Sequence, residues 1–258
     1  MLKPRVFPSL LLKGRGLVKG QQFKNHRYVG DPINAVQIFN KKLVDELLFL
    51  DISATSQECG PNYELLKDIA SEAFMPFAYG GGVENCKQVE KLFNIGVEKV
   101  IINSAVFNNP QFITDASNIA GSQSIVISVD VKRNMIGSHT VYSNNGLKKT
   151  NRKPVEYAKQ LEDLGAGEIV LCSINNEGTA KGYDLELLYE VSREVGIPVV
   201  ASGGAGCLND FKDAINIGKV SAVAAGNMFI FQGKLNAVLP SYPSPKELQD
   251  LFRESNNG

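Results

Sequence analysis

Two stretches, one in each half of the chain, repeat the same order of residue types. Met75–Gly82 reads MPFAYGGG, and Ile197–Gly206 reads IPVVASGGAG. In both, a proline and a short apolar run lead into consecutive glycines, and a helical stretch, a further glycine and a second apolar run follow. Those second runs are KVIINS at 99–104 and VSAVAAG at 220–226. The repeat indicates a chain made from two copies of one half.

The glycines at the ends of these runs are suited to binding an anion. Glycine has no side chain, so backbone N–H groups can approach a phosphate closely, and the N-terminus of the following helix adds a partial positive charge. Taken alone, one Gly-Gly pair more often simply ends a strand. Two pairs at matching places favour two phosphate cradles, and together they predict a small ligand with a phosphate at each end.

Apolar runs alternate with amphipathic helical stretches along the chain. This pattern is typical of a parallel sheet covered by helices, and eight units in one domain favour a closed barrel over an open sheet. With 258 residues, 43% of them hydrophobic, the chain is long enough for such a barrel. The expected strands are Arg5–Leu12, Glu46–Asp51, Met75–Tyr79, Lys99–Asn103, Ser124–Asp130, Glu168–Ser173, Ile197–Ala201 and Val220–Ala225.

The predicted fold class is therefore α/β, a single-domain (β/α)8 TIM barrel with an internal half-barrel repeat. Residues 1–239 form the barrel, in halves of about 1–120 and 121–239, and residues 240–258 form a C-terminal extension with a helix over Lys246–Glu254. Two connections are too long to be idle links. We expect Lys13–Gly30 to be a loop and Val131–Lys153 to be a small hairpin over the barrel mouth.

Composition excludes several classes of function. Lysine plus arginine and aspartate plus glutamate both count 27, so no overall charge attracts nucleic acid or a membrane surface. No apolar run approaches the roughly 18 residues that cross a bilayer, and the N-terminus lacks a small-residue cleavage site, so we expect a cytoplasmic protein. The cysteines form no CxxC and have no nearby histidine, which predicts neither a zinc site nor a disulfide framework, and we expect no metal or other cofactor. They are Cys59, Cys86, Cys172 and Cys207.

Two expected strands end in a carboxylate, Asp51 and Asp130. Active sites of such barrels lie at the carboxyl ends of the strands, so both side chains are expected at the mouth. Asp130 is the stronger candidate for acid/base chemistry because it ends a central strand opposite the predicted cradles. Asp51 is equally well explained as a cap for the loop that follows it.

Four charged residues stand near the starts of expected strands, at the opposite end of the barrel. Charges at strand starts usually face water, but alternating signs would also let four such groups satisfy one another in a ring. These residues are Arg5, Glu46, Lys99 and Glu168.

Six segments together resemble HisF, the cyclase subunit of imidazole glycerol phosphate synthase, over essentially residues 1–235. They are GDP at 30–32, DELLFLDI at 45–52, YGGGV at 79–83, GVEKVIINS at 96–104, GSQSIVISVDVKR at 121–133 and ASGGAG at 201–206. The resemblance implies a barrel that takes ammonia from a glutaminase through its bottom and uses it at the top on a substrate with two phosphates.

The resemblance also assigns roles residue by residue. Asp130 would be one of two catalytic carboxylates and Lys19 the loop lysine, and the ring of four charges matches the ammonia gate of that family in full. One phosphate would be held by Gly82, Asn103 and Ser104. The other would be held by Gly203, Gly204, Ala225 and Gly226.

The chain departs from the family where the substrate would react. Leu11 stands at the place of the other catalytic aspartate, and a leucine cannot transfer a proton. A positioned acid or base contributes about 10² to 10⁴ in rate, so cyclisation should be largely lost. The family's Asp-x-Asp-Gly-Thr after strand six is also changed, to NNEGT at 175–179.

An altered mouth beside an intact entrance resembles a branch of HisF-like proteins in surface polysaccharide, or lipopolysaccharide, gene clusters. The segments YVGDPINAVQIFNKKLVDEL at 28–47 and FQGKLNAVLPSYPS at 231–244 are similar to that branch. The resemblance implies a heterodimer with a HisH-like glutaminase, which relays ammonia to a sugar amidotransferase that forms an acetamidino group.

Two other functions remain open from the sequence. The chain could be an active cyclase of histidine biosynthesis in which another residue replaces the missing aspartate, since Asp130, Lys19 and both cradles are present. It could also be a scaffold that switches on a glutaminase and conducts nothing.

Overall fold

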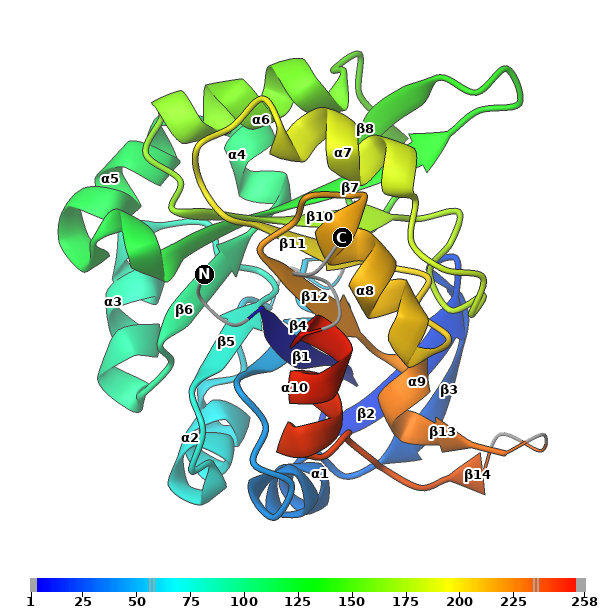
Figure 1. The fold of residues 1–258 in the computed structure, drawn as a ribbon. Coiled ribbons are helices and arrows are strands. Elements are labelled where there is room, and N and C mark those ends of the chain that lie inside the picture. Colours follow the sequence, from blue (N-terminus) through cyan, green and yellow to red (C-terminus); the bar gives the residue numbers. More distant parts are fainter. Residues whose placement is uncertain (1–3, 56, 58, 234, 236, 254–258) are drawn as a thin grey trace.

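The computed structural model describes residues 4–55, 57, 59–233, 235 and 237–253. Within them, eight parallel strands form a closed barrel, because β7 pairs with β10 as well as with β6 (Figure 1). The predicted fold class is confirmed. Going around the barrel, the strands are β1 (Arg5–Lys13), β4 (Leu47–Asp51), β5 (Phe77–Gly80), β6 (Lys99–Ile102), β7 (Ile125–Arg133), β10 (Glu168–Ser173), β11 (Val199–Ser202) and β12 (Ala222–Ala225).

Helices cover the outside of the barrel, each following a strand. Local sequence signals set their ends: Asn85 and Gln88 form a capping box at the start of α3, and Gly96 ends it in the left-handed conformation with φ of 109°. The helices are α1 (Pro32–Asn40), α2 (Tyr63–Glu72), α3 (Cys86–Ile95), α4 (Ser104–Asn108), α5 (Gln111–Ala120), α6 (Pro154–Asp163), α7 (Leu185–Ser192) and α8 (Leu208–Asn216). A short 3-10 helix, η1 (Ser122–Ser124), precedes β7.

Two apolar layers hold the barrel together. The larger lies between strands and helices, and the smaller fills the inside of the barrel, which is a packed core rather than an open pore. In the inner layer the large Phe7 of β1 lies with the small Ala78, Ala222 and Ala224 of other strands. The inner layer is completed by Leu48, Ile101, Val126, Val170 and Val200.

The connection between β1 and α1 is not the loop expected from the sequence. It is an antiparallel hairpin of β2 (Gly16–Gln21) and β3 (Lys24–Gly30), and β2 continues the sheet from the end of β1. Its turn is made by Gln22 and Phe23, with φ of 51° and 62°. The prediction was wrong because these are not the Asn-Gly or Gly-Gly pairs that usually mark such a turn.

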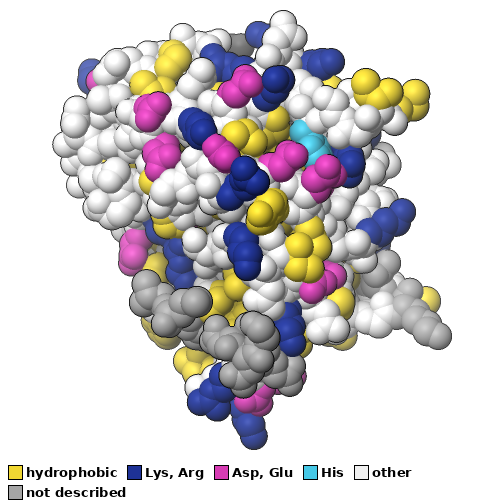
Figure 2. All heavy atoms as spheres, turned by 45° about the horizontal axis from the view of Figure 1, so that its top comes forward, with side chains coloured by type: hydrophobic (Ala, Val, Ile, Leu, Met, Phe, Trp, Pro, Cys, Tyr) yellow, Lys and Arg dark blue, Asp and Glu magenta, His cyan; other side chains and the backbone are white. Residues whose placement is uncertain are grey.

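The second long connection is the predicted hairpin. β7 runs on into β8 (His139–Ser143), which pairs with β9 (Lys148–Lys149), and the link between β7 and β8 projects beyond the helices (Figure 1). Hydrophobic side chains lie at the end of this projection (Figure 2). The opposite turn of the hairpin reaches over the barrel, because the Asn145 amide donates to the Ile52 carbonyl at 2.8 Å.

The chain ends with α9 (Asn227–Ile230), a small hairpin of β13 (Phe231–Gln232) and β14 (Ala237–Val238), and α10 (Pro245–Arg253). Tyr242 ties this end to β1, since its hydroxyl donates to the Val6 carbonyl at 3.0 Å. The predicted C-terminal helix is present to Arg253, and Glu254 lies outside the described residues. No helix in the described part of the chain is long and apolar enough to span a membrane.

Candidate functional site

A cavity of about 500 Å³ opens at the carboxyl ends of the barrel strands. It brings together several residues that the sequence singled out, from different strands or the loops that follow them. Asp51, Asp130 and Leu11 all line it. So do Gly82, Asn103 and Ser104, the first predicted phosphate set.

Asp130 is a buried carboxylate of this cavity. The Asn103 amide donates to its Oδ2 at 2.8 Å, and the Ser128 hydroxyl lies 3.5 Å from its Oδ1. Burial raises the pKa of Asp130 to about 7, against the two hydrogen bonds, and the nearby Glu177 raises it further. A carboxyl group titrating close to neutral pH can both give and take a proton under ordinary conditions.

Leu11 occupies the end of β1 where the resemblance expects a second carboxylate. It pairs with Val18 of β2 on one side and Leu50 of β4 on the other, and it lines the same cavity as Asp130. The cavity wall is therefore apolar at that point, and Leu11 offers Asp130 no acidic partner.

Lys19 lies on β2 and is almost fully buried, at 2% exposure. Its ammonium group donates to the Ser9 carbonyl at 2.5 Å. Burial lowers the pKa of Lys19 to about 8, and the carboxylate of Glu177 opposes that change. A Cβ atom on Gly226 would overlap the Lys19 Nζ, so the amine rests directly on the second predicted cradle.

The first predicted cradle is open to the cavity but partly engaged. Gly82 has φ of 63°, and a Cβ atom there would lie 2.9 Å from the Gly60 backbone, so only glycine fits. The Asn103 amide is held by Asp130 and by the Ser128 carbonyl. Ser104 accepts a hydrogen bond from the Asn144 backbone at 3.2 Å.

The second predicted cradle lies outside this cavity, since none of its residues lines it. The loop between β10 and α7 covers it: the Gly182 N–H donates to the Gly204 carbonyl at 2.9 Å, and the Asn176 amide donates to the Gly182 carbonyl at 2.9 Å. Gly203 has φ of 86° and Gly204 φ of 123°. The structure therefore brings the first cradle to Asp130, whereas the loop covers Gly204 and none of Gly203, Gly204, Ala225 and Gly226 lines the cavity.

Glu177 and His26 are ionisable residues of the cavity that were not identified from the sequence. Burial raises the pKa of Glu177, and Lys19 opposes the change. Burial lowers the pKa of His26, and the charges of Lys13 and Lys19 lower it further. Neither residue stands at a strand end, which was the signal used for Asp130; each reaches the mouth from a connection whose path the sequence did not reveal.

Asp51, in contrast, behaves as a loop cap. Its Oδ1 accepts from the Ser53 backbone at 2.9 Å, from the Ser53 hydroxyl at 2.7 Å and from the Ala54 backbone at 3.1 Å. These contacts favour the interpretation of Asp51 as a loop cap over a role in acid/base chemistry. Among the described residues, no group of three or more histidine, cysteine, aspartate or glutamate side chains could hold a metal ion.

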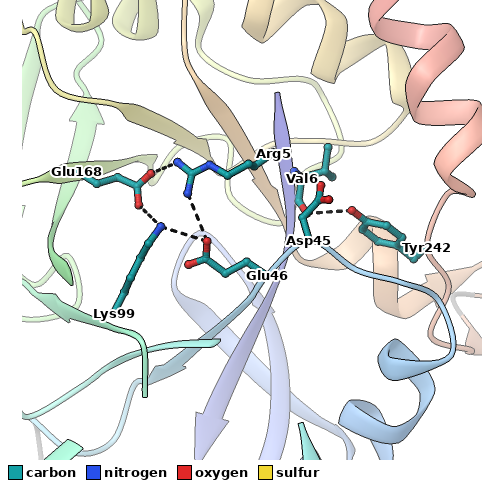
Figure 3. A network of polar contacts seen from close by, with 7 residues as sticks. All are labelled: Arg5, Val6, Asp45, Glu46, Lys99, Glu168 and Tyr242. Atoms are coloured by element: carbon teal, nitrogen blue, oxygen red, sulfur yellow. Dashed lines mark hydrogen bonds and ion pairs between the residues drawn. The ribbon is translucent and has the colours of Figure 1, made fainter. Parts of the chain in front are cut away.

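At the bottom of the barrel the four predicted charges do form a ring (Figure 3). Arg5 contacts both Glu46, at 3.3 Å, and Glu168. Lys99 contacts the same two carboxylates, at 3.1 Å and 2.7 Å. Burial raises the pKa of Glu46, and Glu168 adds to the rise, while Lys99 and Arg5 oppose it. Each carboxylate of the ring thus touches both cations.

The ring lies under the inner apolar layer. The Arg5 guanidinium lies 5.0 Å from the centre of the Phe7 ring, and the Lys99 ammonium lies 5.9 Å from it. Next to the ring, the Val6 backbone donates to Asp45 at 3.2 Å, and Tyr242 approaches the same strand (Figure 3). The start of β1 is therefore fixed from both the ring and the C-terminal segment.

The chain is a closed (β/α)8 barrel with a ring of four charges at one end and a cavity containing a buried carboxyl group at the other. The family model described as Histidine biosynthesis protein matches residues 5–236 of the chain. The chain belongs to this family.

Within the family, the relatives carry HisF names. A protein of Pseudomonas aeruginosa, provisionally named imidazole glycerol phosphate synthase subunit hisF2, is 48% identical over 96% of this chain and 99% of its own length. A Vibrio vulnificus protein, provisionally named subunit hisF3, is 47% identical over 96% and 95%. The imidazole glycerol phosphate synthase subunit HisF of Petrotoga mobilis is 41% identical over 87% and 90%. The predicted resemblance to HisF is confirmed.

Proposed function

We propose that the chain is the synthase subunit of a glutamine-dependent amidotransferase system that forms acetamidino groups on surface polysaccharide sugars. It takes ammonia from a HisH-like glutaminase at the bottom of the barrel and delivers it at the mouth. One observation carries the proposal: the ring of Arg5, Glu46, Lys99 and Glu168 is complete, whereas Leu11 replaces an acid beside Asp130.

The bottom face offers a surface for the glutaminase. Leu43 and Phe74, in loops that lead into β4 and β5, are 72% and 87% exposed. Asn40 fixes the second loop, because its side chain accepts from the Phe74 backbone at 3.0 Å. Exposed apolar side chains held on rigid loops around a charged entrance favour a protein partner there.

The inside of the barrel suits neutral ammonia. Residues such as Phe7, Val126 and Val200 present only apolar groups, and an ion entering such a layer would lose its hydration without compensation. The inner layer is packed, so passage requires side chains to move together with the ring. Glutamine supplies the ammonia, and we place the complex in the cytoplasm, consistent with four free thiols in the described chain.

The alternative is an active cyclase of histidine biosynthesis. It is favoured by the mouth, where Asp130 has a pKa of about 7 and Lys19 of about 8, values suited to proton transfer. Glu177, which lines the cavity with a raised pKa, would then be the group that replaces the missing acid.

One experiment separates these two functions. The purified chain is mixed with the histidine-pathway cyclase substrate and excess ammonium at alkaline pH, which bypasses the glutaminase, and substrate loss is followed. We expect no turnover, and partial turnover after Leu11→Asp, because a second carboxylate then faces Asp130. Leu11→Asn, which has nearly the same shape as that variant without the acid, is the matched control. Turnover by the unchanged chain at an enzyme-like rate would contradict the proposal, and Glu177→Gln would then show whether that residue carries it.

A further inference from the structure

The segment from 131 to 153, here named the mouth hairpin, has an unusual charge. It contains six lysine and arginine residues and no aspartate or glutamate, in a chain whose opposite charges are equal in number. Two of the six are neutralised by other elements, because Arg133 pairs with Glu186 at 2.8 Å and Lys153 with Glu156 at 3.3 Å. The six are Lys132, Arg133, Lys148, Lys149, Arg152 and Lys153.

The mouth hairpin also exposes large apolar side chains at both of its turns. Met135 and Ile136 are 104% and 89% exposed at the projecting turn, where Figure 2 shows hydrophobic side chains standing clear of the surface. Leu147, at the other turn, is 82% exposed. Apolar side chains ringed by charges are typical of a surface that binds another protein.

This hairpin is held rigidly. His139 of β8 lies 3.0 Å from the Asp184 carboxylate, with both side chains buried, and Arg133 reaches the start of α7. Within the projecting turn, the Asn134 side chain accepts from the backbone of Ile136 at 3.0 Å and of Ser138 at 2.9 Å. A preformed surface loses little conformational entropy when a partner binds.

The mouth hairpin borders the cavity that contains Asp130. Asn145 and Leu147 line that cavity, and the Asn144 backbone donates to Ser104, the residue that begins α4. A protein bound to the turn that carries Leu147 would therefore lie over the mouth of the barrel.

We propose that the mouth hairpin docks the enzyme that consumes the ammonia, through an acidic surface of that enzyme with an apolar centre. This inference rests on the proposed function, because ammonia leaving the mouth must pass to its acceptor without escaping to solvent. The hairpin supplies what such a dock needs: an excess of positive charge, apolar contacts and a position at the exit. The balanced charge of the whole chain favours a protein over nucleic acid or a membrane.

The test measures binding of the purified sugar amidotransferase to the full chain by calorimetry, at low and at high salt. We expect Met135→Ser/Ile136→Ser to weaken binding about tenfold or more, since these are the most exposed apolar side chains of the hairpin and a bound partner would bury them. We expect Lys148→Glu/Lys149→Glu to weaken it and to remove most of its salt dependence.

Matched controls change the same residue types elsewhere on the surface. Ile119→Ser/Ile217→Ser replaces two half-exposed isoleucines, and Lys67→Glu/Lys87→Glu replaces two exposed lysines of α2 and α3. Both should bind the amidotransferase like the unchanged chain. All four variants alter exposed side chains, so an unchanged melting temperature verifies that each is folded.

Equal binding by the hairpin variants and the controls would overturn the inference. It would also be overturned if the amidotransferase failed to bind while vesicles of phosphatidylserine and phosphatidylcholine, or a single-stranded RNA, bound through the same lysines. The proposed function can fail separately. If the amidotransferase binds through the hairpin but no glutamine-derived ammonia is transferred to it, the docking inference stands and the proposed ammonia delivery is wrong. If the hairpin variants transfer ammonia at the normal rate, the proposed ammonia delivery stands and the docking inference is wrong.

Discussion

At the bottom of the barrel each buried carboxylate touches charges of opposite sign, whereas at the mouth the buried ionisable groups are held by neutral ones. Glu46 and Glu168 each contact both Arg5 and Lys99. Asp130, in contrast, is held by neutral hydrogen-bond donors, and Lys19 by a backbone carbonyl. In the ring, Lys99 and Arg5 oppose the rise that burial gives the pKa of Glu46, whereas at the mouth burial beside neutral groups moves Asp130 and Lys19 toward their neutral forms.

The difference bears on what each end can do. The four charges of the ring are all paired, so a small molecule that entered there would have to separate at least one of these ion pairs. At the mouth, a carboxyl with a pKa of about 7 and an amine with a pKa of about 8 exchange protons readily near neutral pH. Under the proposed function the bottom would admit ammonia, and the mouth keeps two groups that can exchange protons.

Breaking the ring should have the largest effect on stability. Lys99→Met leaves Glu46 and Glu168 buried with Arg5 as their remaining partner in the ring, and removing one member of a buried charge network costs about 4 kcal/mol. Urea unfolding measures the loss of free energy of unfolding. The matched control, Lys87→Met on the exposed face of α3, should change stability by less than about 0.5 kcal/mol.

The same variant distinguishes a conducting barrel from a scaffold. In the complex with its glutaminase, Lys99→Met should leave glutamine hydrolysis in place and change how much of the ammonia reaches the acceptor. If hydrolysis and transfer both remain as in the unchanged complex, the ring is not part of the route.

At the mouth, Asp130→Asn should stabilise the protein at high pH relative to the unchanged chain. The pKa of Asp130 is about 7 in the folded chain and about 3.9 in the unfolded chain, so its contribution to stability is complete below about pH 4 and is lost as pH rises through 7. The amide of the variant does not titrate, so the difference in unfolding free energy between the variant and the unchanged chain should grow by about 4 kcal/mol between about pH 4 and pH 8.

Denaturant titrations at several pH values measure this growth. The exposed Asp115→Asn on α5 is measured alongside as the comparison. A flat profile for Asp130→Asn would mean that Asp130 stays charged in the folded chain, which would contradict the prediction.

Both ends of the barrel are encoded by strand boundaries, which explains how far the sequence could predict them. Apolar runs placed Glu46, Lys99 and Glu168 near strand starts, and parallel strands in a closed barrel bring such positions together. The same argument placed Asp130 at the mouth. Alternating strands and helices, with glycines after the strands, were sufficient for the fold class.

What the sequence could not predict depends on how connections fold over the mouth. The β2–β3 hairpin turns at Gln22 and Phe23, and this brings His26 to the cavity. The loop that covers Gly204 and presents Glu177 is held by contacts between segments distant in the chain, such as the Gln22 N–H donating to the Glu177 carbonyl at 2.9 Å. Such contacts between distant segments cannot be predicted from local sequence patterns.

The smallest expected effect concerns the contact between the Lys19 ammonium and Gly226. Gly226 has φ of −106°, which any residue adopts, so Gly226→Ala introduces no backbone strain. Its new Cβ would meet the Lys19 ammonium, the far end of a flexible side chain, which should move away from the Ser9 carbonyl toward the cavity. The lost hydrogen bond should cost about 1 kcal/mol of stability.

The movement should also return the pKa of Lys19 from about 8 toward its ordinary value of about 10.4, because the amine is then less buried. Nuclear magnetic resonance titration of the lysine Cε signal follows this change. Gly196→Ala is the matched control, since its Cβ meets only the flexible Glu162 carboxylate. If the Lys19 pKa stays near 8 in Gly226→Ala, burial beneath the covering loop persists without the contact with Ser9. The contrast between the mouth and the ring would then be larger, because the pKa of Lys19 would be set by burial alone and not by a specific hydrogen-bond partner.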